Sequence, residues 1–366
     1  DTMKNLIINK IYVDEKVKKN KLTLDILSRF PDVPAETFHA PSPIYNELVE
    51  KYIDPFLEGK KVLVLSDFKG DFLKQCPGTK GFICCNYYVL NLTTNCPLDC
   101  TYCILQEYLE NNPVLKIFVN INDALRQVEK IHQKNQNVPI RIGTGELTDS
   151  LALDQITGFS ERLIPFFEEK KNLFLELKTK TNRIQNLLKF KGINNTIISW
   201  SLNPQNIIDE DEFFSASLKE RLEAASQCQQ NGFKTAFHFD PIILYKGWEK
   251  DYKALIKKLF DHISPKNIPW ISLGGLRSRP TMKPIVKTRF PINKFMTGEL
   301  LPCEDGKERY FRPQRKKMYA MMIGWLREYD KNLNLYFCME DQNMWNELFA
   351  GLPDYKNVEN ELFYRV

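Results

Sequence analysis

The 366-residue chain lacks any continuous apolar run that approaches the roughly 20 residues needed to cross a bilayer. No N-terminal segment combines basic residues with a continuous apolar stretch, so we expect no signal peptide and no membrane association. Internal repeats and low-complexity tracts are also missing. With 43% hydrophobic and 27% charged residues, the composition instead predicts a globular chain with a large core, organised in one or two domains.

The nine cysteines lack the even spacing of a disulfide framework, and this pattern predicts a reducing, cytoplasmic setting. Three of them fall within "NCPLDCTYCILQ", residues 95–106, where a fourth cysteine is missing. Structural zinc normally takes four ligands from paired C-x2-C clusters, which this loop does not offer. Cys96, Cys100 and Cys103 can instead bind three corners of an iron–sulfur cluster, leaving one iron open. Buried structural cysteines, or a zinc site with a distant fourth ligand, are the alternatives.

A strong net charge is absent as well, since the total of +5 is too small to indicate a nucleic-acid-binding protein by itself. The distribution is more informative. Residues 277–317 contain twelve Lys/Arg against four Asp/Glu, a local excess of eight, so the rest of the chain is about −3. Tyr310 and Phe311 lie among these cations, and phosphate contacts combined with base stacking need this mixture. A solvated surface is the alternative interpretation.

Apolar runs that resemble strands alternate with helical stretches through the middle of the chain. This alternation predicts successive βα units and a parallel sheet. Six units are too few to close an eight-stranded barrel, so we expect an open partial barrel with its active site at the carboxyl ends of the strands. The expected strands are 87–92, 139–145, 172–179, 196–203, 234–243 and 269–276, and the expected helices are 121–133, 153–170, 181–190, 217–230 and 248–263.

Three regions are expected. Residues 1–85 form an irregular N-terminal leader that contains a helix at 41–53, starting near Ser42, and a strand at 60–68. Residues 86–275 form the partial barrel with its cysteine loop. Residues 276–366 form a basic, aromatic α+β extension that contains a helix at 314–329 and a strand at 334–339.

The cysteine loop and the six βα units together resemble the radical S-adenosylmethionine (SAM) superfamily. This resemblance implies a partial (β/α)6 TIM-like barrel and a [4Fe–4S] cluster whose open iron binds SAM. Reductive cleavage of SAM would then release a 5′-deoxyadenosyl radical. The cofactor supplies that chemistry, while the protein supplies position and exclusion of water. An electron donor of the flavodoxin or ferredoxin type is implied as a partner, and the oligomeric state is left open.

A closer resemblance runs from about Pro31 to Met339. The segments "CTYCILQ", "SLKERLEAA", "GWEKDYKALI", "WISLGGLR", "GKERYFRP" and "YFCME" are similar to those of the spore photoproduct lyase family. Those enzymes are DNA-repair lyases that reverse a methylene-bridged thymine dimer. The resemblance therefore implies a carbon–carbon lyase that acts on DNA or a nucleotide. A radical SAM enzyme for an RNA base or a small molecule, and a nucleic-acid-binding protein with a structural or redox-sensing cluster, are the rival hypotheses.

Several positions match the family residue by residue. Tyr102 matches an aromatic of the cluster loop and is the first catalytic candidate. Lys180 matches a lysine that holds the SAM carboxylate, and Ser201 and Thr148 match SAM-contacting hydroxyls. Each has a plainer interpretation: Lys180 as a solvated lysine at a strand end, Thr148 as a helix cap, and Ser201 as a partner of a backbone group.

The basic segment also carries a family match. Arg309 and Tyr310 fall where the family places a DNA-contacting hairpin, and Arg312 follows them in the same segment. His238 is expected at a strand end that faces the site. It is either a site residue or a core histidine whose hydrogen bonds are satisfied.

Two departures from the family pattern concern the return of a hydrogen atom to the product radical. The family's donor cysteine corresponds to Glu146, and its second loop tyrosine, a hydrogen relay, corresponds to Ile104. A carboxylate O–H bond is too strong for such a donor. "GTGE", residues 143–146, instead resembles the motif whose glutamate binds the SAM amino group, and its glycines let the backbone approach a ligand closely. Cys303, beside the basic segment, is the candidate for a replacement donor.

Overall fold

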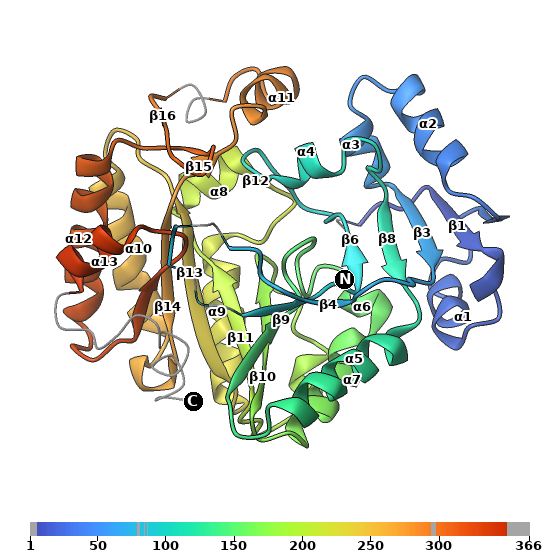
Figure 1. The fold of residues 1–366 in the computed structure, drawn as a ribbon, viewed down its shortest axis with the longest axis horizontal. Helices are drawn as coiled ribbons and strands as arrows, with labels where there is room; N and C mark the ends of the chain where they lie inside the picture. The colour runs from blue at the N-terminus through green and yellow to red at the C-terminus, as the bar shows by residue number, and fades with distance from the viewer. Residues whose placement is uncertain (1–5, 79–80, 84, 86, 294–297, 350–366) are drawn as a thin grey trace.

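The computed structural model describes residues 6–78, 81–83, 85, 87–293 and 298–349. Its strands form two principal sheets that lie next to each other, with helices on their outer sides (Figure 1). In the described residues, no helix has both the length and the apolar character needed to cross a membrane.

The larger sheet has eight strands in the order β18-β14-β13-β11-β10-β9-β5-β4. Every neighbouring pair is parallel except β4 with β5. The sheet curls into an open half-barrel, and this confirms the predicted fold class. Its strands are β4 (Leu73–Gln75), β5 (Tyr88–Leu90), β9 (Ile140–Gly143), β10 (Leu173–Thr179), β11 (Thr196–Ser201), β13 (Lys234–Ile242), β14 (Ile271–Gly275) and β18 (Leu335–Phe337).

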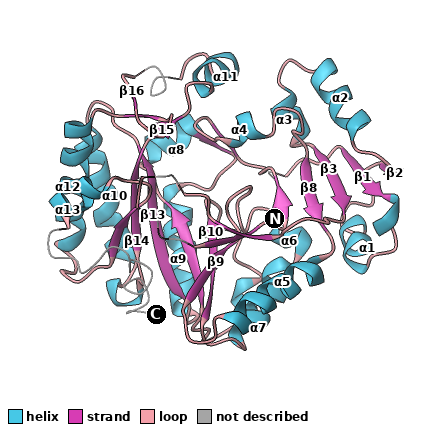
Figure 2. Cartoon of the chain, viewed as in Figure 1, coloured by secondary structure: helices cyan, strands magenta, loops and turns pink. Residues whose placement is uncertain are grey.

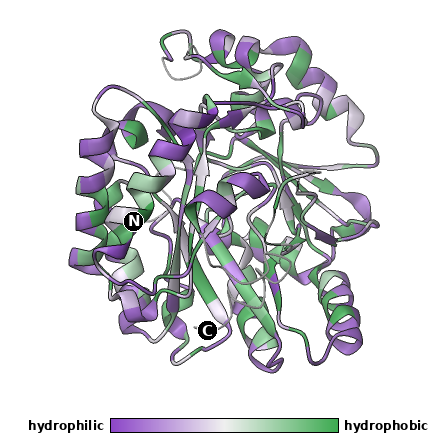
Figure 3. Ribbon diagram, turned by 60° about the vertical axis from the view of Figure 1, so that its left-hand side comes forward, coloured by the Kyte–Doolittle hydropathy of each residue, from purple (hydrophilic) through white to green (hydrophobic). Residues whose placement is uncertain are grey.

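Helices cover the outer face of this sheet (Figure 2). α7 packs against β10, while α9 packs against β11 and β13. In Figure 3 the central strands are mostly hydrophobic, whereas the helices carry hydrophilic and hydrophobic residues side by side, as amphipathic helices over a buried sheet should. The helices of this layer are α5 (Ile121–Lys134), α6 (Asp154–Thr157), α7 (Phe159–Glu168), α9 (Leu218–Gln230), α10 (Trp248–His262) and α12 (Arg312–Arg327).

Local sequence explains where these helices start and stop. Ser217 and Glu220 form a reciprocal capping box that fixes the start of α9. Gly158, at φ +61°, divides the helix predicted at 153–170 into α6 and α7. The helix predicted at 181–190 is wrong, because this segment contains turns and a 3-10 helix at Leu187–Lys189. There the hydroxyl of Thr181 accepts from the backbone N–H of Arg183, a side-chain bond of the kind that competes with helix formation.

The N-terminal region is more regular than predicted. Its strands build a second sheet in the order β2-β1-β3-β8-β6, in which all pairs but β6 with β8 are parallel. Since β6 and β8 come from beyond residue 85, the sheet crosses the predicted boundary. The elements are β1 (Lys10–Asp14), α1 (Lys21–Leu27), β2 (Ala35–Phe38), α2 (Ser42–Lys51), α3 (Pro55–Gly59), β3 (Val62–Ser66), β6 (Thr93–Thr94) and β8 (Leu115–Phe118).

The C-terminal region contributes to the half-barrel and to one wall above it. β18 extends the large sheet, so the boundary predicted at 275 is crossed as well. A small antiparallel sheet in the order β15-β17-β16 lies beside α11 at the carboxyl ends of the barrel strands (Figure 1). The elements are β15 (Arg277–Ser278), α11 (Met282–Arg289), β16 (Leu301–Pro302), β17 (Glu308–Arg309) and α13 (Gln342–Leu348).

Candidate active site

The inner face of the half-barrel is lined by polar residues. Parallel pairing places Ser201, His238, Ser272 and Tyr336 side by side on β11, β13, β14 and β18. His238 Nε2 lies 2.7 Å from Glu176 Oε1, so this histidine has a satisfied partner within the lumen. Burial opposes ionisation of Glu176, but the guanidinium of Arg141 and the imidazole of His238 outweigh it and hold the pKa of the carboxyl far below its usual range. The lumen therefore keeps buried charges in fixed positions.

The three-cysteine loop follows β5 and contains the short strand β7 (Asp99–Cys100) and helix α4 (Leu105–Tyr108). Side chains from outside the loop hold its backbone. The buried ammonium of Lys60 donates to the carbonyl oxygens of Cys96 at 2.7 Å and Leu98 at 2.6 Å. From within the loop, Gln106 Nε2 donates to the carbonyl of Thr101 at 2.9 Å. These contacts fix the path of the loop.

Arg289, at the end of α11, binds both the cysteine loop and the N-terminal region. Its Nε donates to Asp54 at 2.8 Å, and its Nη2 donates to Asp99 at 2.9 Å. Nη1 donates to the side-chain oxygen of Gln106. One guanidinium therefore joins α11 to the N-terminal region and to the cysteine loop.

These residues fit an iron–sulfur cluster. Cys96 and Cys103 lie in an apolar group with Phe56, Leu98, Leu105, Leu109 and Leu147, which shields them from water. Burial raises the pKa of all three thiols, that of Cys96 to about 12. An all-sulfur ligand set spread over separate iron atoms suits a cluster better than one zinc ion.

A buried carboxylate, Glu212, connects two of the predicted site residues. It follows α8 (Gln205–Asp211), in the short strand β12 (Glu212–Phe213), which pairs with β7. Tyr102 donates its hydroxyl to Glu212, and Lys180 Nζ lies 3.8 Å from the same carboxyl oxygen. Burial opposes ionisation of Glu212, but Arg221 at 2.6 Å and Lys180 outweigh it and lower its pKa to about 2. Sequence reasoning missed this carboxylate because "DEDEFF" reads as a solvated acidic run.

The other predicted cofactor residues surround the same edge of the barrel. Glu146 lies in the turn after β9 and accepts from Asn91 Nδ2 at 2.8 Å. Thr148 precedes Asp149, whose carboxylate accepts from the backbone N–H of Lys180 at 2.6 Å. Ser201 is buried, and its carbonyl accepts from Arg221 Nη1 at 2.9 Å. Asp149 thus links the segment of Thr148 to Lys180, and Arg221 links Ser201 to Glu212, which lies near Lys180. The sequence analysis singled out neither Asp149 nor Arg221.

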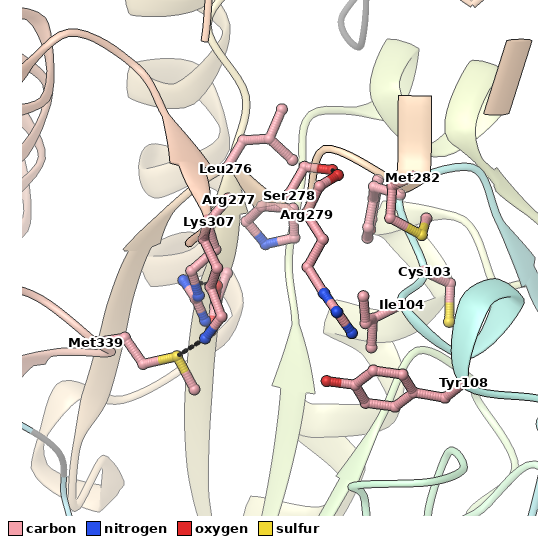
Figure 4. A pocket seen from close by; sticks show the side chains of 13 residues that line it. Cys103, Ile104, Tyr108, Leu276, Arg277, Ser278, Arg279, Met282, Lys307 and Met339 are labelled. Atoms are coloured by element: carbon pink, nitrogen blue, oxygen red, sulfur yellow. Dashed lines mark hydrogen bonds and ion pairs between the residues drawn. The ribbon is translucent and has the colours of Figure 1, made fainter. Parts of the chain in front are cut away.

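A cavity of about 320 Å³ opens between the cysteine loop and the end of the barrel (Figure 4). Cys103, Ile104 and Tyr108 lie on one side of it, and Arg277, Lys307 and Met339 lie on the other. Tyr102 also lines the cavity. Asp240, at the end of β13, accepts two 3.0 Å hydrogen bonds from Arg277 in its wall. His238 and Asp240 are two residues apart in "FHFDP", so on a strand their side chains point to the same face. This spacing was the sequence signal that Asp240 points inward.

The basic hairpin differs from the expectation of exposed DNA contacts. Arg309 is only 2% exposed and donates to both carboxylate oxygens of Asp305, at 2.6 and 2.7 Å. Tyr310 is also buried, and its hydroxyl accepts from the backbone N–H of Leu244 at 3.0 Å. Arg309 therefore holds the hairpin together, whereas Tyr310 ties it to the segment after β13, and neither side chain projects into solvent. Of the three residues predicted to contact nucleic acid, only Arg312 has an exposed side chain, with 40% exposed and a pairing to Glu347.

Cys303 lies in this hairpin between β16 and β17. Its Sγ donates to the carbonyl of Leu301 at 3.7 Å, and its exposure is intermediate. Cys303 is not one of the described residues that line the 320 Å³ cavity. Cys84 lies outside the described residues, and Cys228 is buried in α9.

An open parallel half-barrel with a C-x3-C-x2-C loop at its carboxyl edge defines the radical SAM class of enzymes. Within that class, the family model of spore photoproduct lyase matches residues 82–319. The chain belongs to the spore photoproduct lyase family. The recognition made from the sequence and the lyase class that it implies are therefore confirmed.

Individual relatives agree with this assignment. The spore photoproduct lyase of Clostridium acetobutylicum is 25% identical over 345 residues, which cover 92% of this chain and 97% of the relative. That of Bacillus subtilis is 24% identical over 306 residues, covering 82% and 85%. A solved spore photoproduct lyase complexed with dinucleoside spore photoproduct superposes with a TM-score of 0.81 at 20% identity, over 91% of this chain and 100% of the other. A double-mutant spore photoproduct lyase with bound AdoMet and the same dinucleoside gives 0.80.

Proposed function

We propose that this protein repairs the spore photoproduct, a methylene-bridged thymine dimer, in a cavity beside its iron–sulfur cluster. The observation that carries the proposal is the 320 Å³ cavity between Cys103 of the cysteine loop and the Asp240–Arg277 pair. A ligand there touches the cluster loop and the carboxyl ends of the barrel strands together, which is where such barrels place their chemistry. The solved relatives carrying dinucleoside spore photoproduct support the choice of substrate.

In this proposal Cys96, Cys100 and Cys103 hold a [4Fe–4S] cluster, and SAM binds beside it. The cofactors supply a 5′-deoxyadenosyl radical when bound. Glu146 accepts from the SAM amino group, and Lys180 donates to the SAM carboxylate. Thr148 and Ser201 border the same site. Glu212 positions Lys180 and Tyr102 together, and its burial keeps both side chains in one orientation.

The cavity also carries cations at its rim. Arg279 has 45% of its side chain exposed, and Lys283 in neighbouring α11 has 38% exposed. Arg279 lines the cavity and pairs with Glu107 at 3.0 Å, while Lys283 follows the lining residue Met282 and pairs with Glu308 at 2.9 Å. Phosphates of a DNA strand can replace these carboxylates as partners. We assign the DNA-facing role of the basic segment to Arg279, Lys283 and Arg312 instead of Arg309 and Tyr310.

Partners and setting follow from the same chemistry. Reducing the cluster needs a one-electron donor, and small proteins of the flavodoxin or ferredoxin type are the proposed class. No disulfide bond is found among the described residues, which agrees with the proposed reducing cytoplasm. Glu146 and Ile104, which replace the family's thiol donor and relay tyrosine, are the observations that favour a second candidate: radical SAM chemistry on another nucleotide.

The proposed function is tested by anaerobic incubation of the reconstituted protein with SAM, a reductant and dinucleoside spore photoproduct. We expect formation of 5′-deoxyadenosine and loss of the dimer. Mass spectrometry measures both. Cleavage of SAM without any loss of the dimer would favour the second candidate.

SAM affinity tests the placement of the two charged ligands. Glu146→Ala and Lys180→Ala are each expected to weaken binding of SAM by about 1–3 kcal/mol, the usual contribution of a charge-assisted hydrogen bond. Titration of SAM into the cluster-loaded protein, followed by its visible spectrum, measures the change. Lys219→Ala, at an 81% exposed side chain on α9, is the control and should leave affinity unchanged. Normal affinity for SAM in both variants would show that Glu146 and Lys180 do not bind it.

Salt dependence tests the cations of the rim. Binding to single-stranded DNA should weaken linearly in log affinity against log salt, because phosphate contacts release counterions. Replacing Arg279 or Lys283 by alanine is expected to flatten that slope by about 0.7 for each lost phosphate contact. Arg309→Ala should instead lower the melting temperature, because it leaves Asp305 without its bidentate partner. An unchanged slope in all rim variants would show that DNA binds another face of the protein.

A further inference from the structure

Cys338, the residue after strand β18, brings a thiol to the inner face of the half-barrel. Tyr336 and Cys338 line the same recess, while Phe337 between them lies on the other side. Phe337 packs in the core, with its ring 4.5 Å from that of Tyr319. Tyr336 lies in the lumen, where Arg141 Nη2 donates to its hydroxyl at 3.3 Å. The backbone N–H of Cys338 donates to the carbonyl of Leu273 at 2.9 Å, which fixes the thiol in this register.

Cys338 lies directly behind the wall of the candidate substrate cavity. Its Sγ accepts from Arg277 Nη2 at 3.3 Å, and Arg277 lines the cavity opposite Cys103. The next residue, Met339, has φ +56° and itself lines the cavity. Cys338 also lines a smaller recess of about 50 Å³, which shares Asp240 with the larger cavity. A ligand that extends past Asp240 therefore meets the thiol.

A buried guanidinium in the same recess has two nitrogen atoms without a hydrogen-bond acceptor among the described residues. Arg141 is 3% exposed and lines the recess together with Cys338. Its Nε and Nη1 atoms have no hydrogen-bond partner, although Glu176 lies 3.6 Å from Nε. The rings of Tyr87, Trp270 and Tyr336 surround the guanidinium at 4.8–5.4 Å. Such a group is suited to an oxygen acceptor that enters the recess, for example a carbonyl at the edge of a pyrimidine ring.

Cys303, Cys85 and Cys228 are less suitably placed. Cys303 lies in the hairpin and contacts the carbonyl of Leu301. Cys85 lines the same recess, but Arg141 Nη2 donates to its Sγ at 2.7 Å, and it does not line the larger cavity. Cys228 is buried in α9 within the main core. Burial raises the pKa of the Cys338 thiol above its usual range, so at neutral pH it carries the hydrogen that a radical would remove.

We propose that Cys338 is the hydrogen-atom donor that quenches the product radical in this chain. The inference rests on the proposed function. The Sγ–H bond breaks homolytically, its hydrogen atom forms a C–H bond on the thymine carbon radical, and a thiyl radical remains on Cys338. A soluble thiol then gives a hydrogen atom to that thiyl radical, which restores the S–H bond and leaves the soluble thiol oxidised. Glu146 occupies the position where the family resemblance expects the donor, and Cys338 lines a recess that is also lined by Gly145, the residue before Glu146.

Deuterium transfer provides the test, because thiols exchange their hydrogen with the solvent. The cluster-loaded enzyme is incubated in D2O with SAM, a reductant, dithiothreitol and dinucleoside spore photoproduct. Wild type should consume the dimer and release the repaired dinucleoside with one deuterium. Cys338→Ala and Cys338→Ser should still consume the dimer, but the deuterated product should be lost in favour of abortive products. Serine preserves size and polarity, yet its O–H bond is too strong to donate. Cys303→Ala is the matched control and should behave as wild type, and Cys85→Ala tests the other thiol that lines the recess.

A second measurement does not depend on turnover. Dinucleoside spore photoproduct bound to the wild-type holoenzyme should slow alkylation of Cys338 by N-ethylmaleimide while leaving Cys303 unaffected, as read by peptide mass spectrometry. Undiminished deuterated product in both Cys338 variants, or its loss in Cys303→Ala or Cys85→Ala instead, would overturn the proposal. Failure of wild type to consume the dimer would overturn the proposed function itself, so the two failures are distinguishable.

Discussion

Replacing Cys96, Cys100 or Cys103 by alanine is expected to abolish cluster binding and all cleavage of SAM. Thiolates are the only protein bonds that such a cluster has here, so loss of one in three leaves it labile. Wild type reconstituted without oxygen should hold about four irons and four sulfides. Iron and sulfide analysis, together with visible absorption, measures the effect.

Cys228→Ala is the matched control for these variants, because Cys228 is buried in α9 and belongs to the main core. It should retain a full cluster, although its cavity will cost stability. A single tightly bound zinc ion in wild type, or a full iron content in any of the three loop variants, would contradict the assignment.

The second large effect concerns the buried pair of Arg221 and Glu212. Arg221 is fully buried and donates to Glu212 at 2.6 Å and to the carbonyls of Ala216 and Ser201 at 2.8 and 2.9 Å. Arg221→Met leaves a buried carboxylate without its main partner, and we expect a loss of about 3–5 kcal/mol in the free energy of unfolding. Denaturant unfolding of the cluster-free protein measures it. Glu223→Gln, at an exposed pair with Lys219, is the control and should cost less than about 1 kcal/mol.

The same pair gives a pH dependence of defined sign. The pKa of Glu212 is about 2 in the folded protein, against 4.5 for a free glutamate. Its ionisation therefore stabilises the fold fully above pH 4.5, and this contribution disappears as the pH falls from 4.5 to 2. The shift corresponds to a contribution of up to about 3 kcal/mol. Glu212→Gln should remove this part of the acid sensitivity, and an unchanged stability profile between these pH values would refute the interpretation.

Much of the half-barrel could be predicted, because its strands are buried on both faces and appear as apolar runs. The six expected strands are found, each within a few residues of its predicted ends. Of the N-terminal sheet, the strand predicted at 60–68 is found as β3, but β1 and β2 were missed because they are short, and only Ile11 and Val13 of β1 are buried apolar residues. The pairing of this sheet also uses β8, which lies far along the chain. Periodicity within a segment does not report such pairing.

The residue types of the candidate site were predictable, but the orientations of its side chains were less so. The spacing of Cys96, Cys100 and Cys103 indicated a cluster loop because the loop is local in sequence. The burial of Arg309 and Tyr310 was not predictable, because it depends on Asp305 and on a backbone group at Leu244. A motif gives the identity of a side chain, whereas its orientation depends on partners that fold beside it.

Strand β18 has a consequence for the order in which the protein is made. It is the edge strand of the large sheet and the last of that sheet's strands to leave the ribosome. The three loop cysteines, Glu146 and Lys180 emerge more than a hundred residues earlier. A chain that stopped near residue 330 would therefore carry the parts proposed to start a radical reaction, but it would lack Cys338 to end one.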